Sequence, residues 1–307
     1  MKIRPLPLSV LLIALCAAGL LLVETARQRR DLSVRGMLLR LPWQEEGVQV
    51  FVDTQTLRRA GLLEMLAGSR ASEELDYRRF VEAVQFDYRE DLDVICGVLA
   101  GARSNFILKG RLSWADIRAY AERHGAQCRA GYCGLEGRSP DRFLSFYPIS
   151  EDVLSIGIDE DIWAAAGTRK QHAEPAGFWI PPQPFWVAVP GKVLADPGEL
   201  PPGISAFVSQ VKGAKRMTLA IGAAGDSYEA EMRARFDTDA DAAASRENLE
   251  RSTGMLRSFL NRENQTPGPD DLSRLLVSGV FEQKGTEVIG RWPITRGFLE
   301  KLSAGTL

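Results

Sequence analysis

The first 30 residues indicate that this chain is directed to a membrane. Basic residues flank an almost unbroken apolar run at residues 6–23. A helix of this length spans about 27 Å at 1.5 Å per residue, close to the roughly 30 Å of a bilayer core. Residues 1–30 therefore predict a signal anchor, a single transmembrane helix, and residues 31–47 predict a juxtamembrane linker.

A cleaved signal peptide is the alternative for this segment. Cys16 and Ala18 are small enough for the positions that a signal peptidase requires. Cleavage there would leave the apolar residues 20–23 at the new N-terminus, so the sequence favours an uncleaved anchor.

Two cysteines indicate on which side of the membrane the chain lies. Cys128 and Cys133 flank residues 129–132, which are suited to a short hairpin loop, and facing cysteines across such a loop can form a disulfide. The alternative is a pair of reduced, half-buried thiols. A disulfide persists only in an oxidising compartment. We therefore expect a single-pass inner-membrane protein with most of its chain periplasmic.

Composition and proline content predict two domains. The remainder of the 307-residue chain suits two units of roughly 150 residues. Half of the sixteen prolines lie within residues 175–202, and proline-rich segments stiffen linkers. The predicted divisions are the anchor at 1–30, the linker at 31–47, a first α+β domain at 48–170, a proline-rich linker at 171–184 and a second α+β domain at 185–307.

The two halves repeat the same order of predicted elements. In the first half, strand 48–52 is followed by helices, by the paired strands 92–99 and 105–112, and by a helix that Ser113 caps. In the second half, strand 185–189 and the hairpin 217–236 precede a helix capped by Asp237 or Asp239. Both halves are βαββαβ, which predicts a tandem repeat of ferredoxin-like domains.

Several of these segments resemble a group of bacterial proteins. The segments are the apolar run, Leu41-Pro42 before the first strand, and Phe86-Asp87-Tyr88-x-x-Asp91-Leu92-Asp93. Their order resembles uncharacterised exported bacterial proteins that have one N-terminal apolar segment and a duplicated extracytoplasmic α+β region. The resemblance implies a location in the bacterial envelope and brings no catalytic residues.

No motif in the sequence predicts catalysis. The chain has only two histidines, His124 and His172, so a nucleophile activated by histidine has few ways to form. Phosphate-loop and dinucleotide fingerprints are absent from the sequence. A zinc site built from His124, Cys128 and Cys133 has no common spacing. We therefore predict no catalytic residue, no cofactor and no metal.

Aromatic residues around the proline-rich linker form the strongest candidate binding segment. Phe178, Trp179, Phe185 and Trp186 accompany several prolines, a composition that favours binding of a partner. The alternative, which the apolar strand pattern around Trp186 favours, is that these rings pack between the two domains.

These expectations leave two functional classes. The first is a membrane-anchored, non-enzymatic binding module of the envelope, whose partner is another envelope protein or a lipid. The second is an envelope hydrolase with a site assembled from scattered Ser, Asp and Glu residues. The net charge of −2 without a basic stripe excludes a nucleic-acid partner. The scarcity of histidine favours the binding module.

Overall fold

The computed structural model describes residues 32–42, 45–63, 75–137, 141–174, 179–195, 208–225, 227–264 and 266–304. Within these ranges no helix combines the length and apolar character needed to cross a membrane, so the predicted transmembrane helix is not found in the described part of the chain. Residues 1–30, from which it was predicted, lie outside the described residues.

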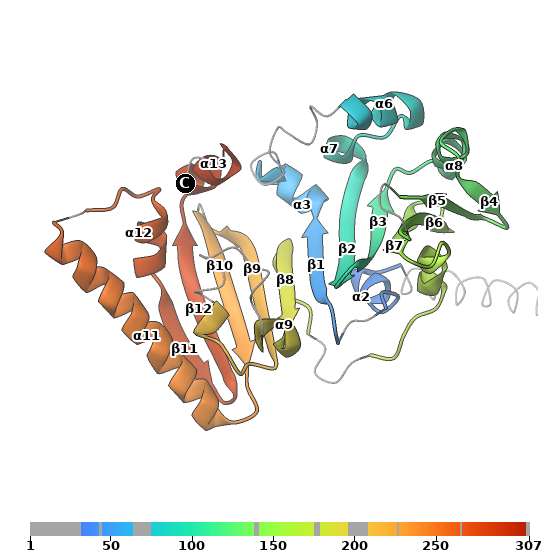
Figure 1. Cartoon of the computed structure of the whole chain (residues 1–307). Helices are drawn as coiled ribbons and strands as arrows, with labels where there is room; N and C mark the ends of the chain where they lie inside the picture. Colours follow the sequence, from blue (N-terminus) through green and yellow to red (C-terminus); the bar gives the residue numbers. More distant parts are fainter. Residues whose placement is uncertain are drawn as a thin grey trace, which may run out of the picture.

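Twelve strands form one antiparallel sheet (Figure 1). The strands are β1 (Val48–Asp53), β2 (Leu92–Ala100), β3 (Arg103–Gly110), β4 (Gln127–Arg129), β5 (Tyr132–Glu136), β6 (Phe143–Ser150), β7 (Val153–Asp159), β8 (Phe185–Pro190), β9 (Arg216–Ala224), β10 (Ser227–Arg235), β11 (Val280–Lys284) and β12 (Glu287–Ile294). Their order across the sheet is β11-β12-β10-β9-β8-β1-β2-β3-β7-β6-β5-β4.

Short helices connect the strands, and one long helix, α11, packs on the sheet in the second half of the chain. They are α2 (Val34–Leu38), α3 (Thr54–Arg59), α6 (Leu75–Val84), α7 (Tyr88–Asp91), α8 (Trp114–Arg123), α9 (Gly191–Ala195), α11 (Asp239–Arg262), α12 (Leu272–Val277) and α13 (Arg296–Ala304), with a 3-10 helix η1 at Ala164–Arg169.

The predicted pair of ferredoxin-like domains is wrong. A split βαβ unit needs helical crossovers that return the chain to a parallel strand. Here β1 pairs antiparallel with β2, and β8 pairs antiparallel with β9. The helices α3, α6 and α7 return the chain to the end of the sheet where β1 finishes (Figure 1), so the chain enters β2 from that same end and runs antiparallel to β1.

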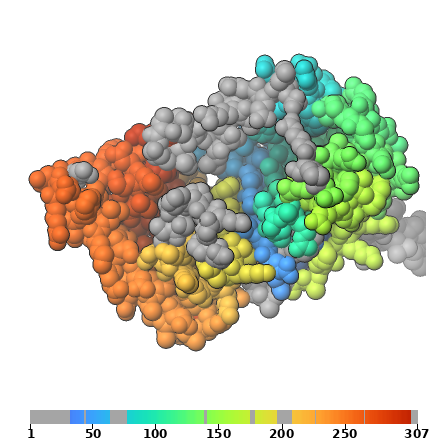
Figure 2. Space-filling model, in the orientation of Figure 1, coloured from blue at the N-terminus to red at the C-terminus, as the bar shows by residue number. Residues whose placement is uncertain are grey.

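The two halves meet through β1 and β8, which pair antiparallel in the middle of the sheet. In register, Val50 lies opposite Val187, and Phe51 lies opposite Trp186. Figure 2 shows the result: residues 75–137 and residues 227–304 lie at opposite ends of the molecule, with the strands around β1 and β8 between them.

One face of the sheet carries most of the helices. Val52 packs into the apolar cluster beneath α11 and α13, and Ile95 packs into the cluster beneath α6 and α8. These two residues are direct partners across β1 and β2, so both clusters lie on the same face. On the opposite face, α2 covers Phe51 and Trp186 at the centre of the sheet.

Both predicted hairpins form, but only one of the two predicted helix caps is correct. The hairpins β2–β3 and β9–β10 form as expected. Ser113 caps α8, since its Oγ accepts a hydrogen bond from the backbone N–H of Asp116. The cap of α11 is Thr238 and not Asp237 or Asp239, because the Thr238 Oγ1 accepts from the N–H of Asp241 at 3.1 Å.

Candidate binding cavity

The predicted disulfide joins Cys128 of β4 to Cys133 of β5, which are direct partners in the hairpin. Ala130 and Gly131 form its turn with φ values of 47° and 87°. Positive φ at both central residues is typical of the tight turns that connect antiparallel strands. The loop is therefore two residues long, whereas the sequence predicted the four residues 129–132. The disulfide links the edge strand β4 to its neighbour β5.

The four aromatic residues of the predicted binding segment do not form one surface. Trp186 is 1% exposed and stacks on Phe51, whereas Phe185 points to the other face of β8 and packs into the cluster beneath α11. Trp179 is 40% exposed and lies over the guanidinium of Arg233, 4.4 Å from Cζ to the ring centroid. Phe178 lies outside the described residues.

Beneath α8 the structure contains an apolar cavity of about 330 Å³. Residues of strands β3, β5, β6 and β7 line it on the side of the sheet, and residues of α6 and α8 line it on the side of the helices. Every surface that lines it is apolar. The lining residues are Phe80, Phe86, Leu108, Leu112, Ile117, Tyr120, Ala121, His124, Leu135, Leu144, Phe146, Leu154 and Ile156.

Aromatic contacts join the two helices that line the cavity. Phe80 of α6 contacts Tyr120 of α8 edge to face at 5.3 Å between centroids, and it contacts Phe86 in the same manner at 6.4 Å. Such edge-to-face pairs add about 0.5–1.5 kcal/mol beyond the burial of their area. The rings therefore fix α6 against α8 while the space between α8 and the sheet stays unfilled.

The exposed member of the lining is His124, at the C-terminal end of α8. Its Nδ1 donates a hydrogen bond to the carbonyl oxygen of Tyr120 at 2.8 Å, and its ring lies 4.1 Å from the Tyr120 ring. The guanidinium of Arg123 lies 5.9 Å from the same tyrosine ring. The exposed His124 marks an opening of the cavity, its mouth, at this end of α8, and Arg123, which does not line the cavity, lies next to it.

The disulfide hairpin borders this cavity. Cys133 is the direct partner of Phe146, and Leu135 is the direct partner of Leu144. Three of these residues, Leu135, Leu144 and Phe146, line the cavity. The disulfide therefore fixes the strand that forms one wall of the cavity.

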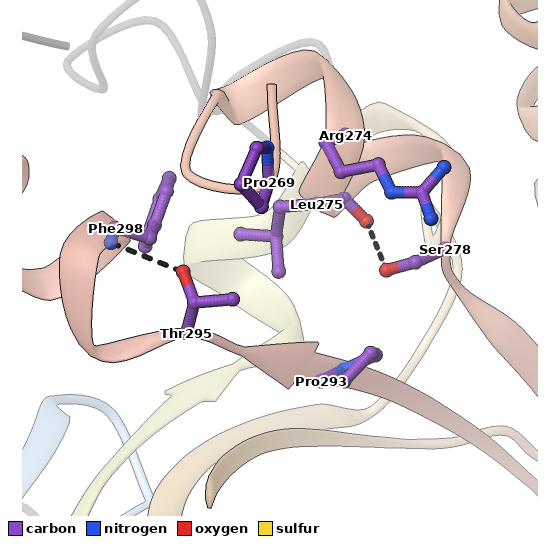
Figure 3. Close-up of a pocket in the computed structure, with 7 residues that line it drawn as sticks. All are labelled: Pro269, Arg274, Leu275, Ser278, Pro293, Thr295 and Phe298. Carbon is purple, nitrogen blue, oxygen red and sulfur yellow. Dashed lines mark hydrogen bonds between the residues drawn. The ribbon is translucent and has the colours of Figure 1, made fainter. Parts of the chain in front are cut away.

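A second pocket, of about 250 Å³, lies where β12 leads into α13 (Figure 3). Its lining is Pro269, Arg274, Leu275, Ser278, Pro293, Thr295 and Phe298. The Ser278 Oγ donates to the carbonyl of Leu275 at 2.7 Å, and the Thr295 Oγ1 donates to Asp270 at 2.6 Å. Both hydroxyls serve local structure, and neither histidine of the chain lines this pocket, so it offers no nucleophile paired with an imidazole base.

Elsewhere in the described chain, strong shifts in pKa have structural causes. Burial raises the pKa of Tyr77 to about 12, and its hydroxyl donates to the Asp87 carboxylate. Hydrogen bonds from the Arg89 side chain lower the pKa of Asp87. Burial also raises the pKa of the Cys96 thiol, which lies in the core as the sequence predicted. None of these three groups lines either pocket.

Sequence reasoning did not identify the cavity as a site. The predicted helix that Ser113 caps contains Ile117 and Ala121, which the structure buries, and Phe80 of α6 is partly buried. Periodicity shows which residues point inward but does not show whether they fill the space there. The sequence signal that remains is the large number of aromatic rings at these inward positions.

Comparisons with known proteins assign this chain to no family. No family model and no curated protein matches it. Among solved structures it is similar to crystal form I of TP0453, with a TM-score of 0.48 and 10% sequence identity over 87% of this chain and 95% of that chain. Crystal form III of TP0453 has a TM-score of 0.46 and 9% identity over 87% and 96%. Likenesses this distant carry no argument about function.

Proposed function

We propose that this protein is a non-enzymatic binding protein that works outside the cytoplasm and holds an apolar ligand in the cavity beneath α8. The observation that carries the proposal is the wholly apolar lining of a cavity of about 330 Å³. Ligand pockets have volumes of about 300–1,000 Å³ and are lined mainly by apolar and aromatic side chains.

Packing physics supports occupation of this cavity by a ligand. Protein interiors are close-packed, and voids larger than a water molecule are few. An apolar cavity offers water no hydrogen-bond partner, so such cavities stay dry and accept apolar molecules. The apolar surface of a ligand that enters it gains about 25 cal/mol per Å² removed from water.

The disulfide supports the proposed location. Cys128 and Cys133 are paired, and disulfides persist in oxidising compartments such as the bacterial periplasm. The predicted position at the outer side of the inner membrane belongs to the same proposal. Labelling of thiols in unbroken cells tests it: we expect Cys128 and Cys133 to react with a maleimide only after reduction. Reaction without a reductant would contradict an extracytoplasmic location.

A cavity-filling substitution tests the binding function. Ala121 is 4% exposed and lines the cavity, whereas Ala119 lies on the exposed side of the same helix. In Ala121→Leu the added carbon atoms occupy the cavity, so we expect affinity for a fluorescent apolar probe, N-phenyl-1-naphthylamine, to fall by about tenfold or more, or 1.4 kcal/mol. We expect stability to be unchanged or higher, because the substitution fills a void.

Ala119→Leu is the matched control, because it adds the same atoms to α8 outside the cavity. We expect it to bind the probe as the wild type does. Equal binding by Ala121→Leu would show that the probe does not enter the cavity. Failure of the folded wild type to bind the probe would overturn the proposed function.

A further inference from the structure

The charges at the mouth of the cavity indicate which end of a ligand lies there. Arg123 has no carboxylate partner among the described residues, and its Nε donates only to the backbone carbonyl of Ala119 at 3.2 Å. The other arginine of α8, Arg118, is paired with Glu122 at 2.8 Å. Glu122 therefore pairs with Arg118, one helical turn before it. Arg123, beside the apolar cavity, is left to interact with a ligand.

A cation at this position has a second physical effect. The C-terminal end of a helix carries a partial negative charge, which arginine and histidine side chains offset. That effect needs no ligand and accounts for basic residues at the end of α8. Because residues three and four positions apart are neighbours on a helix, the same end of α8 also places both side chains beside the Tyr120 ring that lines the cavity.

From this geometry we infer that the cavity takes the hydrocarbon chain of a single-chain amphiphile, and that the anionic headgroup of this ligand lies at the mouth against Arg123. The inference rests on the proposed function and adds the class of ligand to it. The cavity excludes the headgroup because its lining offers no polar surface, so a charge inside would lose its hydration without compensation. Outside the cavity, the headgroup is in contact with solvent and with the guanidinium of Arg123.

Displacement of the apolar probe by four amphiphiles with the same chain tests this inference. These are dodecanoic acid, dodecyl phosphate, dodecanol and dodecyltrimethylammonium. We expect the acid or the phosphate to bind about threefold to fivefold more tightly than the alcohol, the factor that a solvent-exposed charge pair supplies. We expect the cationic amphiphile to bind more weakly than the alcohol. Whichever of the two anions binds better distinguishes a carboxylate from a phosphate headgroup.

Substitution of Arg123 distinguishes a role in ligand binding from a role in stabilising the C-terminal end of α8. In Arg123→Gln the preference for the anionic amphiphile over dodecanol should disappear, while the affinity for dodecanol stays the same. In Arg262→Gln, a matched control that removes a basic residue from the last turn of α11 away from the cavity, the preference should persist. Added salt should weaken the binding of the anion to the wild type and leave that of the alcohol unchanged.

The possible failures can be told apart. Equal affinity for the acid, phosphate, alcohol and cation, or a preference for anions that survives in Arg123→Gln, would overturn the inference and leave the proposed function standing. Failure of all four to displace the probe would overturn both. A selective loss of anion binding in Arg123→Gln would support the inference, because a structural role at the helix end would weaken all ligands alike.

Discussion

The rings of Phe51 and Trp186 stack across the β1–β8 pair with their centroids 5.4 Å apart and an interplanar angle of 19°. They are direct partners in the register, and both are buried on the face that α2 covers. Through this contact the two halves of the chain share one sheet and the apolar cluster beneath α2. Each half therefore protects the edge strand that the other would expose.

Trp186→Ala tests whether this contact joins the two halves. Trp186 is 1% exposed, so its truncation should reduce the free energy of unfolding by about 3–5 kcal/mol. We also expect urea unfolding to separate into two transitions, because the β1–β8 pair loses its central contact. Trp179→Ala is the control: it removes an exposed indole and should change stability by less than about 1 kcal/mol. A single unshifted transition for Trp186→Ala would contradict the role of this contact.

The sequence predicted the elements of the fold better than their pairing. The β9–β10 hairpin was predictable because the alternation in residues 228–236 and the short turn before it leave the two strands only one way to pair. The antiparallel pairing of β1 with β2 was not predictable. The order of a strand, helices and a strand does not show whether the helices carry the chain back to the start of β1 or leave it at the end where β1 finishes. The β1–β8 contact joins residues more than 130 positions apart, and no local pattern encodes it.

Asn105 is a buried polar residue that should lower stability. It is 0% exposed on β3, and neither atom of its side-chain amide has a hydrogen-bond partner among the described residues. A buried polar group without a partner costs about 1–3 kcal/mol. We expect Asn105→Leu, which has a similar volume, to raise the free energy of unfolding by about 1 kcal/mol or more in urea titrations. A destabilised Asn105→Leu would instead indicate that ordered water satisfies the amide.

The Cys128–Cys133 disulfide should stabilise the hairpin beside the cavity. A loop closed by a sequence separation of 5 restricts the unfolded chain by about 2 kcal/mol. We expect the double variant Cys128→Ala/Cys133→Ala to lose about that amount and to bind the apolar probe more weakly, because the β5 wall is less fixed. Reduction of the wild type should reproduce both changes. Cys96→Ala tests the free thiol separately and should leave probe binding unchanged.

The candidate site was less predictable than the fold, for a physical reason. The helix that Ser113 caps was predicted, and its residues Ile117 and Ala121 are buried. Whether an inward face packs tightly depends on the distance between α8 and the sheet, which no pattern within α8 encodes. The aromatic linker was more conspicuous in sequence, yet Phe185 and Trp186 pack into opposite sides of the sheet.

The carboxylate of Asp87 should make stability depend on pH in the acid range. Hydrogen bonds from Arg89 lower its pKa below the ordinary value of 3.8, and Asp87 also accepts from Tyr77. Because the folded pKa is the lower one, this contribution is fully present above the unfolded pKa and is lost as pH falls through the folded pKa. We expect Asp87→Asn to be less stable than the wild type at neutral pH and to lose this difference as the pH falls below the ordinary aspartate pKa and through the lowered folded pKa. Arg89→Gln should behave similarly, because it removes the main cause of the shift. Urea titrations over this range provide the measurement, and wild-type pH dependence in both variants would contradict the assignment.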